Sequence, residues 1–428
     1  MYLLNGKRFN LTKLSFYSTA FSILLGLLSN RIINQTDILM VSTLGENFLS
    51  ASVFTNNLMI IDSLIAFTIA PIISIQVTFL KIQELKDKIP KWLSFTLIIG
   101  IFLTIICYFV YPHIANYVIQ NNEIKYIADR SIFYMTLCIT PRLFCLVSSM
   151  MLYSLGQGIN VILTNVICVL LNAIGNFLFM ILLKLGYDGI YYSTLLISFI
   201  NMFLFMSIFY FKGYNILKFF DINDVSIIIH QSKYEIPRQL LERVSIIIMI
   251  EMISENAHIS SAYALATSYV FLISVLFIPL LRSLSIYFSK KPLGIRQIIK
   301  GFKIDCAFGI FFLTILTCFF ISYRYEIGST YNLTSQSNIW WSSFVIIFSI
   351  SMILRLMDTF LRSIFISRNK NQYLLLSDLI STVLMLLICK IGFLLDNPFV
   401  FWSSMITFPL VCVLVLMLNI KKVQLSLV

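Results

Sequence analysis

Long apolar segments alternate with short polar connections along the whole chain. Each segment is a continuous apolar run of about 20 residues or more, the length that a membrane-spanning α-helix needs. The runs lack the strict apolar–polar alternation of a membrane β-strand. The pattern therefore predicts an all-α polytopic membrane protein with twelve transmembrane helices, at residues 15–43, 48–80, 92–112, 127–153, 159–183, 190–211, 236–256, 259–288, 304–323, 339–366, 373–394 and 398–420.

The composition excludes several other classes of protein. Of the 428 residues, 59% are hydrophobic and 12% are charged, about half the charged share of a soluble domain. A soluble fold of this length cannot bury so much apolar surface. Large soluble enzymes, disordered chains and secreted disulfide scaffolds are thereby excluded. The eight cysteines lie in apolar segments without metal-ligand spacing, so we expect small core residues and no metal or other cofactor.

The net charge of +12 reflects membrane orientation rather than a nucleic acid partner. Lysine and arginine gather in alternate connections, 20 on one side of the predicted membrane and 4 on the other. Such a bias marks the cytoplasmic side. We therefore expect a multi-pass protein of the bacterial inner membrane with both termini in the cytoplasm. The four basic residues on the outer side are Lys125, Lys184, Arg324 and Lys390.

The chain divides into two similar halves. The connection 212–235 is the longest polar interruption, and its pattern predicts an amphipathic helix on the cytoplasmic surface. Landmarks before it recur about 210 residues later: a small-residue patch, a proline in the next span, a basic connection and a polar turn. Two six-helix lobes, 1–211 and 236–428, are then related by a pseudo-twofold axis along the membrane normal. We expect a monomer.

Four segments carry a family resemblance. NQTDILMVSTLGENFLSAS (34–52) resembles the first-helix motif of the multidrug and toxic compound extrusion (MATE) family, and YSLGQGINVILTNVICVLLNAIGNFLFM (153–180) resembles its span 4–5 signature. KYEIPRQLLERVS (233–245) and RLMDTFLRSIFISRNKNQ (355–372) are similar to its span 7 and span 10 motifs. The chain is thus identified as a divergent member of this family, within the multidrug, oligosaccharidyl-lipid and polysaccharide flippase superfamily.

The resemblance implies a cation site in the first lobe. Asp37 matches the family's span 1 aspartate, and carboxylates inside a bilayer usually have a role. Asn172 and Asn176 are four residues apart, so they share one face of span 5 and can add neutral oxygen ligands for H⁺ or Na⁺. The alternative is that Asp37 and the asparagines only join helices by hydrogen bonds.

A second site is expected in the other lobe. Glu242 and Asp358 match the family's span 7 and span 10 acids, as residues for substrate binding or coupling. Arg355 and Arg362 lie three residues before and four after Asp358, on one stripe with a formal charge of +1. This stripe favours a zwitterionic, anionic or amphiphilic peptide-like cargo. The alternatives are an ion-pair lattice at Asp358 and an ion pair of Glu242 with Arg238 or Arg243.

Two further intramembrane residues, Pro141 and Asp62, bear on the architecture. Pro141 predicts a kink in span 4, because proline removes a helix hydrogen bond. Asp62 in span 2 has no matching motif. It either faces the cavity or pairs with Arg31 or Arg142, and we favour the structural role.

The predicted function is secondary active export of small organic or amphiphilic compounds by alternating access, coupled to H⁺ or Na⁺ as an antiporter. One alternative is a lipid-linked oligosaccharide flippase of the same superfamily, whose intramembrane arginines would bind a pyrophosphate. Another is a membrane glycosyltransferase or acyltransferase, but the longest outer connections carry no catalytic cluster. We therefore expect a transporter rather than an enzyme.

Overall fold

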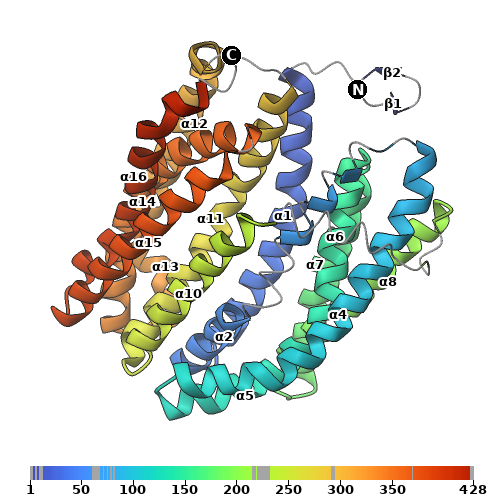
Figure 1. Cartoon of the computed structure of the whole chain (residues 1–428). Helices are drawn as coiled ribbons and strands as arrows, with labels where there is room; N and C mark the ends of the chain where they lie inside the picture. The colour runs from blue at the N-terminus through green and yellow to red at the C-terminus, as the bar shows by residue number, and fades with distance from the viewer. Residues whose placement is uncertain are drawn as a thin grey trace. The chain divides into compact units, whose positions relative to one another are not determined.

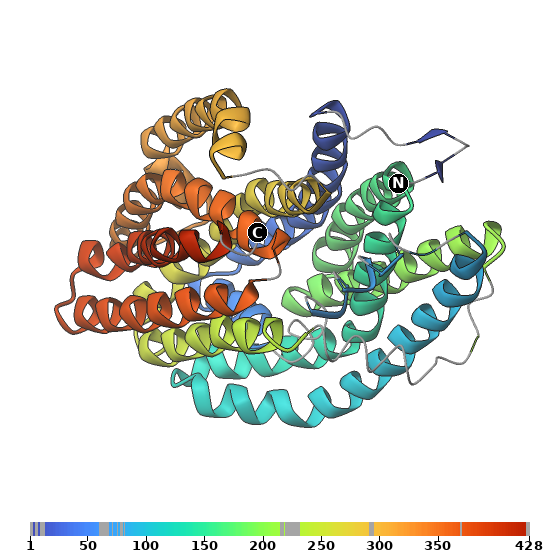
Figure 2. The ribbon, with the colours of Figure 1, turned by 45° about the horizontal axis from the view of Figure 1, so that its top comes forward.

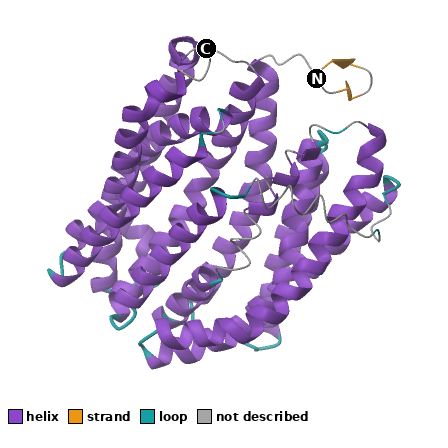
Figure 3. Ribbon diagram, viewed as in Figure 1, coloured by secondary structure: helices purple, strands orange, loops and turns teal. Residues whose placement is uncertain are grey.

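The computed structural model is helical almost throughout (Figures 1 and 3). The exception in the described part is a short antiparallel pairing of β1 (Leu3–Leu4) with β2 (Lys7–Arg8), which the sequence pattern did not predict. The structure describes residues 3–4, 7–8, 13–59, 68–70, 72–74, 76–77, 80, 82–214, 218, 232–290, 295–368 and 370–424.

The first compact unit comprises residues 1–10 and 21–243. Its helices fall on the predicted spans 1 to 6, except that 60–67, 71, 75, 78 and 79 in span 2 lie outside the described residues. Within this unit α2 packs on α5, α4 on α5 and α6, and α8 on α6 and α7. The elements are α1 (Lys13–Ser42), α2 (Glu46–Leu58), α4 (Ile82–Val118), α5 (Asn122–Leu137), α6 (Ile139–Ser154), α7 (Gly158–Asn176), the π-helical η1 (Phe177–Leu182) and α8 (Tyr187–Phe211).

The second compact unit comprises residues 11–20 and 244–428. Its helices follow the predicted spans 7 to 12, and α14 lies at its centre, in contact with α11, α12, α15 and α16 (Figure 2). The elements are α10 (Glu235–Ile253), α11 (Ala257–Lys290), α12 (Ile295–Ser322), α13 (Arg324–Thr330), α14 (Ser335–Ser367), α15 (Asn371–Leu394) and α16 (Pro398–Gln424).

The contact-based boundary between the units falls within α10, so the predicted lobes 1–211 and 236–428 stay a prediction. The predicted amphipathic helix at 212–235 lies mostly outside the described residues.

Span 4 is bent, as Pro141 predicts. α5 and α6 meet at Cys138 with an angle of 51° between them. Proline lacks the amide hydrogen that would continue the helix across this point. A second bend, of 62° between α12 and α13, was not predicted, and it carries the chain out of span 9.

The surfaces of the long helices suit a bilayer. Within the described residues seven helices are long and apolar enough to span a membrane, or nine when each bent pair counts as one span. Large apolar side chains such as Phe102 and Phe109 on α4 and Phe308 on α12 are more than 60% exposed. Lipid tails solvate such side chains, so this exposure is expected of membrane-facing helices.

Candidate ion and substrate sites

Three side chains from α7 and α8 surround Asp37 of α1 in the first unit. The amide nitrogens of Asn172 and Asn176 donate hydrogen bonds to Asp37 Oδ1, at 2.7 and 2.5 Å. The hydroxyl of Thr194 on α8 donates to Asp37 Oδ2 at 3.2 Å. We call Asp37, Asn172, Asn176 and Thr194 the N-lobe cluster. The predicted site residues of this lobe are therefore in direct contact, although contact alone does not establish their role.

Glycines bring α7 and α8 close enough to form the N-lobe cluster. Gly175 lies against the Ser193 hydroxyl, and a Cβ there would clash with it. A Cβ on Gly189 would lie 2.7 Å from the backbone carbon of Phe179. Small residues allow such close approach of membrane helices. Because α7 and α8 approach closely here, Thr194 reaches the carboxylate that the two asparagines hold.

A small cavity of about 20 Å³ adjoins the carboxylate. A space of this size holds about one water molecule or a small ion. Arg142 also lines it, and its guanidinium donates to Met135 Sδ at 3.4 Å. The lining residues are Asn34, Asp37, Ile38, Ser52, Asn56, Met135, Arg142, Ile190, Tyr191 and Thr194.

The chemical groups of the N-lobe cluster suit a proton or Na⁺. As placed, two N–H groups and one O–H group stabilise an ionised carboxylate. Within the described part of the chain, Oδ1 of Asn172 and Oδ1 of Asn176 have no hydrogen-bond partner. A half-turn of either amide would present this oxygen to a protonated Asp37 or to a hard cation. No group of three or more His, Cys, Asp or Glu side chains gathers in that part of the chain to hold another metal.

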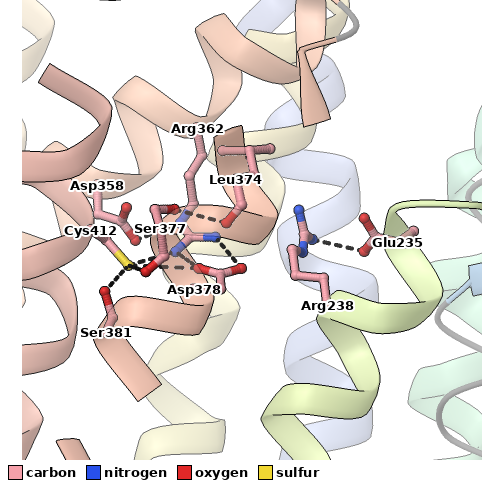
Figure 4. Close-up of polar contacts among 9 residues, drawn as sticks. All are labelled: Glu235, Arg238, Asp358, Arg362, Leu374, Ser377, Asp378, Ser381 and Cys412. Carbon is pink, nitrogen blue, oxygen red and sulfur yellow. Dashed lines mark hydrogen bonds and ion pairs between the residues drawn. The ribbon is translucent and has the colours of Figure 1, made fainter. Parts of the chain in front are cut away.

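The second unit holds a cluster of opposite charges, shown in Figure 4. Arg362 Nε donates to Asp358 Oδ2, four residues earlier on α14, at 2.7 Å. Its two terminal nitrogens donate to the two carboxylate oxygens of Asp378 on α15, with Nη1–Oδ2 at 3.1 Å. Arg362 Nη2 also contacts Cys412 Sγ of α16 at 3.0 Å. We call Asp358, Arg362, Asp378 and Cys412 the α14–α15 cluster.

Asp378 changes the charge of the predicted arginine stripe. Arg355, Asp358 and Arg362 alone sum to +1, and the carboxylate of Asp378 brings the sum to zero. The expectation of an anionic cargo therefore no longer follows from this stripe. Arg355 points to other groups, with Nε 3.4 Å from Ser351 Oγ and the guanidinium 5.1 Å from the Phe348 ring. The alternative of an ion-pair lattice at Asp358 matches the observed geometry.

Asp378 was not among the predicted site residues, although its place in the sequence is a signal for such a role. Asp378 is a carboxylate inside the apolar span 373–394. A charge inside a membrane is costly, so such a residue is usually paired with another group. Thr194 gave no signal, because single threonines are common in membrane helices.

Glu242 is exposed on α10. Arg238, one predicted partner of Glu242, forms an ion pair with Glu235 at 2.7 Å (Figure 4). Asp62 lies outside the described residues, so its predicted place stays a prediction.

Residues 22–178 match the family model MatE. The whole chain also resembles solved transporters of this family at low sequence identity. An inward-facing MATE transporter of the MOP superfamily gives a TM-score of 0.75 at 14% identity, over 92% of this chain and 94% of that one. The chain has the fold of the MATE transporters. This likeness confirms the predicted all-α, twelve-helix, two-lobe fold class.

Two further solved structures give similar values. A Vibrio cholerae MATE transporter, VcmN, in an Asp-to-Asn variant has a TM-score of 0.75 at 14% identity, with 96% of each chain covered. A Pyrococcus furiosus transporter described by the reverse polarity of its binding pocket has a TM-score of 0.73 at 14% identity, over 96% of this chain and 95% of that one. No curated protein sequence matches the chain.

Proposed function

We propose that this protein is a secondary active exporter of small organic or amphiphilic compounds, driven by inward movement of H⁺ or Na⁺. The observation that carries the proposal is the N-lobe cluster: one membrane-embedded carboxylate, three donors and two amide oxygens that can turn towards a cation. The MATE fold supplies the context, because transporters of this class work by alternating access.

The coupling follows from the electrostatics of Asp37. An ionised carboxylate inside a membrane is costly unless it is compensated. The three donors compensate it in part, and a proton or Na⁺ completes the compensation by neutralising its charge. A cargo that competes with the coupling ion for this lobe would then bind more tightly to the protein in one state of Asp37, ionised or neutralised, than in the other. Such a difference in affinity is what links two bound species thermodynamically.

The α14–α15 cluster has a secondary place in the proposal. Glu242, Asp358, Arg355 and Arg362 remain proposed residues for substrate binding or coupling in the C-terminal lobe. The guanidinium of Arg362 already sits between two carboxylates. This arrangement favours a fixed link between α14 and α15, and it leaves the N-lobe cluster as the main coupling site. It also weakens the flippase alternative, since Arg362 is engaged within the protein rather than available to a pyrophosphate.

Placement in the bacterial inner membrane, with both termini in the cytoplasm, is part of the same proposal. It rests on the bias of lysine and arginine towards one side of the spans.

Ion replacement in reconstituted vesicles tests the proposed function. Purified protein is placed in vesicles loaded with ethidium, and an inward H⁺ or Na⁺ gradient is imposed separately. We expect one of the two gradients to accelerate ethidium movement against the ion flow. Loss of this acceleration when the gradient is collapsed by an ionophore is the control. Transport that is indifferent to both gradients would refute ion-coupled export.

A further inference from the structure

Three polar side chains form one stripe along α8. Tyr187, Tyr191 and Thr194 are spaced i, i+4 and i+7, so they share a face of the helix. Tyr187 is the first residue of α8, and Thr194 donates to Asp37. With a rise of 1.5 Å per residue, the stripe covers about 10 Å of the helix axis. It therefore connects the end of the lobe with the membrane-embedded carboxylate.

The hydroxyl groups of this stripe are linked by hydrogen bonds. The phenol oxygens of Tyr187 and Tyr191 lie 3.0 Å apart. Tyr191 donates in turn to Ser52 Oγ of α2 at 2.9 Å. Both phenols are 4% exposed, so they are shielded from bulk water and lipid. The bond between Tyr187 and Tyr191 joins two residues of one helix, and it contributes nothing to the association of different helices.

The inner end of this hydroxyl chain opens on the Asp37 cavity. Ser52 and Tyr191 line the same cavity of about 20 Å³ as Asp37 and Thr194. A cavity of this size accommodates one water molecule between polar groups. One such water would connect the Ser52 and Tyr191 hydroxyls with the Asp37 carboxylate.

The outer end of the chain lies beside a carboxylate that reaches the surface. Asp188 follows Tyr187 and forms an ion pair with Arg130 of α5. The side chains of Asp188 and Arg130 are 22% and 43% exposed. Among the described residues, Asp188 Oδ1 has no hydrogen-bond partner. The first phenol is therefore adjacent in the chain to one partner of a partly exposed ion pair.

We propose that Tyr187, Tyr191 and Ser52 form a proton relay between this end of the lobe and Asp37. A proton arriving at the Tyr187 oxygen displaces the phenol's own proton to Tyr191. Tyr191 passes its proton to Ser52 or the cavity water, and the last transfer protonates the Asp37 carboxylate. Each O–H bond that breaks is replaced by another, so every hydroxyl ends neutral and rotates back. The inference rests on the proposed function with H⁺ as the coupling ion.

Proton-arrival kinetics at Asp37 test the relay. The protein in lipid vesicles receives a rapid drop in pH, and protonation is followed by the infrared carboxyl band that disappears in Asp37→Asn. We expect Tyr187→Phe and Tyr191→Phe to lower the rate at which this band appears roughly a hundredfold. This is the contribution of a positioned proton-transfer group. The pH midpoint of the band at equilibrium should stay close to that of the wild type.

Tyr192→Phe is the matched control, because Tyr192 lies on the same helix but outside the hydroxyl chain, with its ring 4.9 Å from that of Tyr134. Partial restoration of the rate in Tyr187→Phe by a small permeant acid such as azide would support the relay. If Tyr191→Phe does not fold, Tyr187→Phe and Ser52→Ala still test it. Rates in the folded variants equal to that of Tyr192→Phe would overturn it. Absence of any carboxyl band sensitive to Asp37→Asn would instead contradict protonation of Asp37, and with it the proposed proton coupling.

Discussion

Asn172 lies 135 residues after Asp37 in the chain, yet its amide nitrogen donates a 2.7 Å hydrogen bond to the Asp37 carboxylate. Asn172 is 1% exposed, so the bond is shielded from solvent. Hydrogen bonds to an ionised group are stronger than those between neutral groups. The pair therefore fixes α1 against α7 most firmly when Asp37 is charged, and loss of that charge is the event that weakens the link.

Asp37→Asn should abolish gradient-driven export while leaving the fold intact. The substitution keeps the size of the side chain and removes the only acid of the N-lobe cluster. The measurement is ethidium export from vesicles under the driving gradient, with thermal unfolding to monitor the fold. Asp87→Asn is a matched control, because Asp87 is half-exposed and pairs with Lys91 and Lys218 away from this cluster. Undiminished export in Asp37→Asn would show that this carboxylate does not couple transport.

Asn172→Ala and Asn176→Ala should distinguish H⁺ from Na⁺ coupling by the direction in which they shift the half-saturating ion concentration for export. Removing a donor to the charged carboxylate costs about 1.5–3 kcal/mol, so Asp37 would take up a proton at lower proton concentration. For Na⁺, the same change removes an oxygen ligand, so half-maximal export would require more Na⁺. The half-saturating ion concentration for export is measured in each variant.

Asn165→Ala is the control for these two variants, because Asn165 is buried on the same helix two turns earlier. A half-saturating concentration that moves equally in all three variants would mean that the asparagines act only through packing.

The sequence predicted the parts of this site that depend on helical periodicity and on motif. Asn172 and Asn176 fall on one face because they are four residues apart, and Asp37 was identified from its span 1 motif. Thr194 could not be found in this way, since its contact depends on how closely α7 and α8 approach at Gly175 and Gly189. That approach is a property of the packed helices rather than of either segment.

The helices themselves were largely predictable, because continuous apolar runs and a proline kink are local features. Pairing between charges was less predictable. The ion pair of Arg238 with Glu235 was not predicted, and Arg362 binds Asp378 as well as the expected Asp358. Several acids lie within reach of a long arginine side chain, and only the packed helices decide among them.

Gly189→Ala should disturb the N-lobe cluster from a distance. The added Cβ would lie 2.7 Å from the Phe179 carbon, and that backbone cannot move away cheaply. α8 would shift outward and carry Thr194 away from Asp37. We expect a lower unfolding temperature and reduced coupled export. Gly309→Ala is the control, because its Cβ meets only a leucine methyl at 3.4 Å. Equal behaviour of the two variants would contradict the packing argument.

Both termini and the basic connection that contains Lys86 are expected in the cytoplasm. Lys86→Cys and Lys125→Cys place a single thiol in connections on opposite sides of span 3, in a background without other cysteines. An impermeant maleimide added to whole cells should label the Lys125 position and spare the Lys86 position until the cells are opened. Labelling of the Lys86 position from outside would contradict the proposed orientation.

Arg362→Met should destabilise the protein more than the loss of either acidic partner alone. Without the guanidinium, Asp358 and Asp378 remain buried with uncompensated charge, which costs about 3–5 kcal/mol. The variant that combines Arg362→Met with Asp358→Asn and Asp378→Asn removes all three charges, and should recover most of the lost stability because no buried charge is left unpaired. Thermal unfolding of the purified protein in detergent measures both effects. Arg355→Gln is the control, because it removes an arginine from the same helix and leaves Arg362 between Asp358 and Asp378. If the triple variant is no more stable than Arg362→Met, the destabilisation arises from lost packing of the arginine stem, and the charge balance between α14 and α15 is not what holds these helices together.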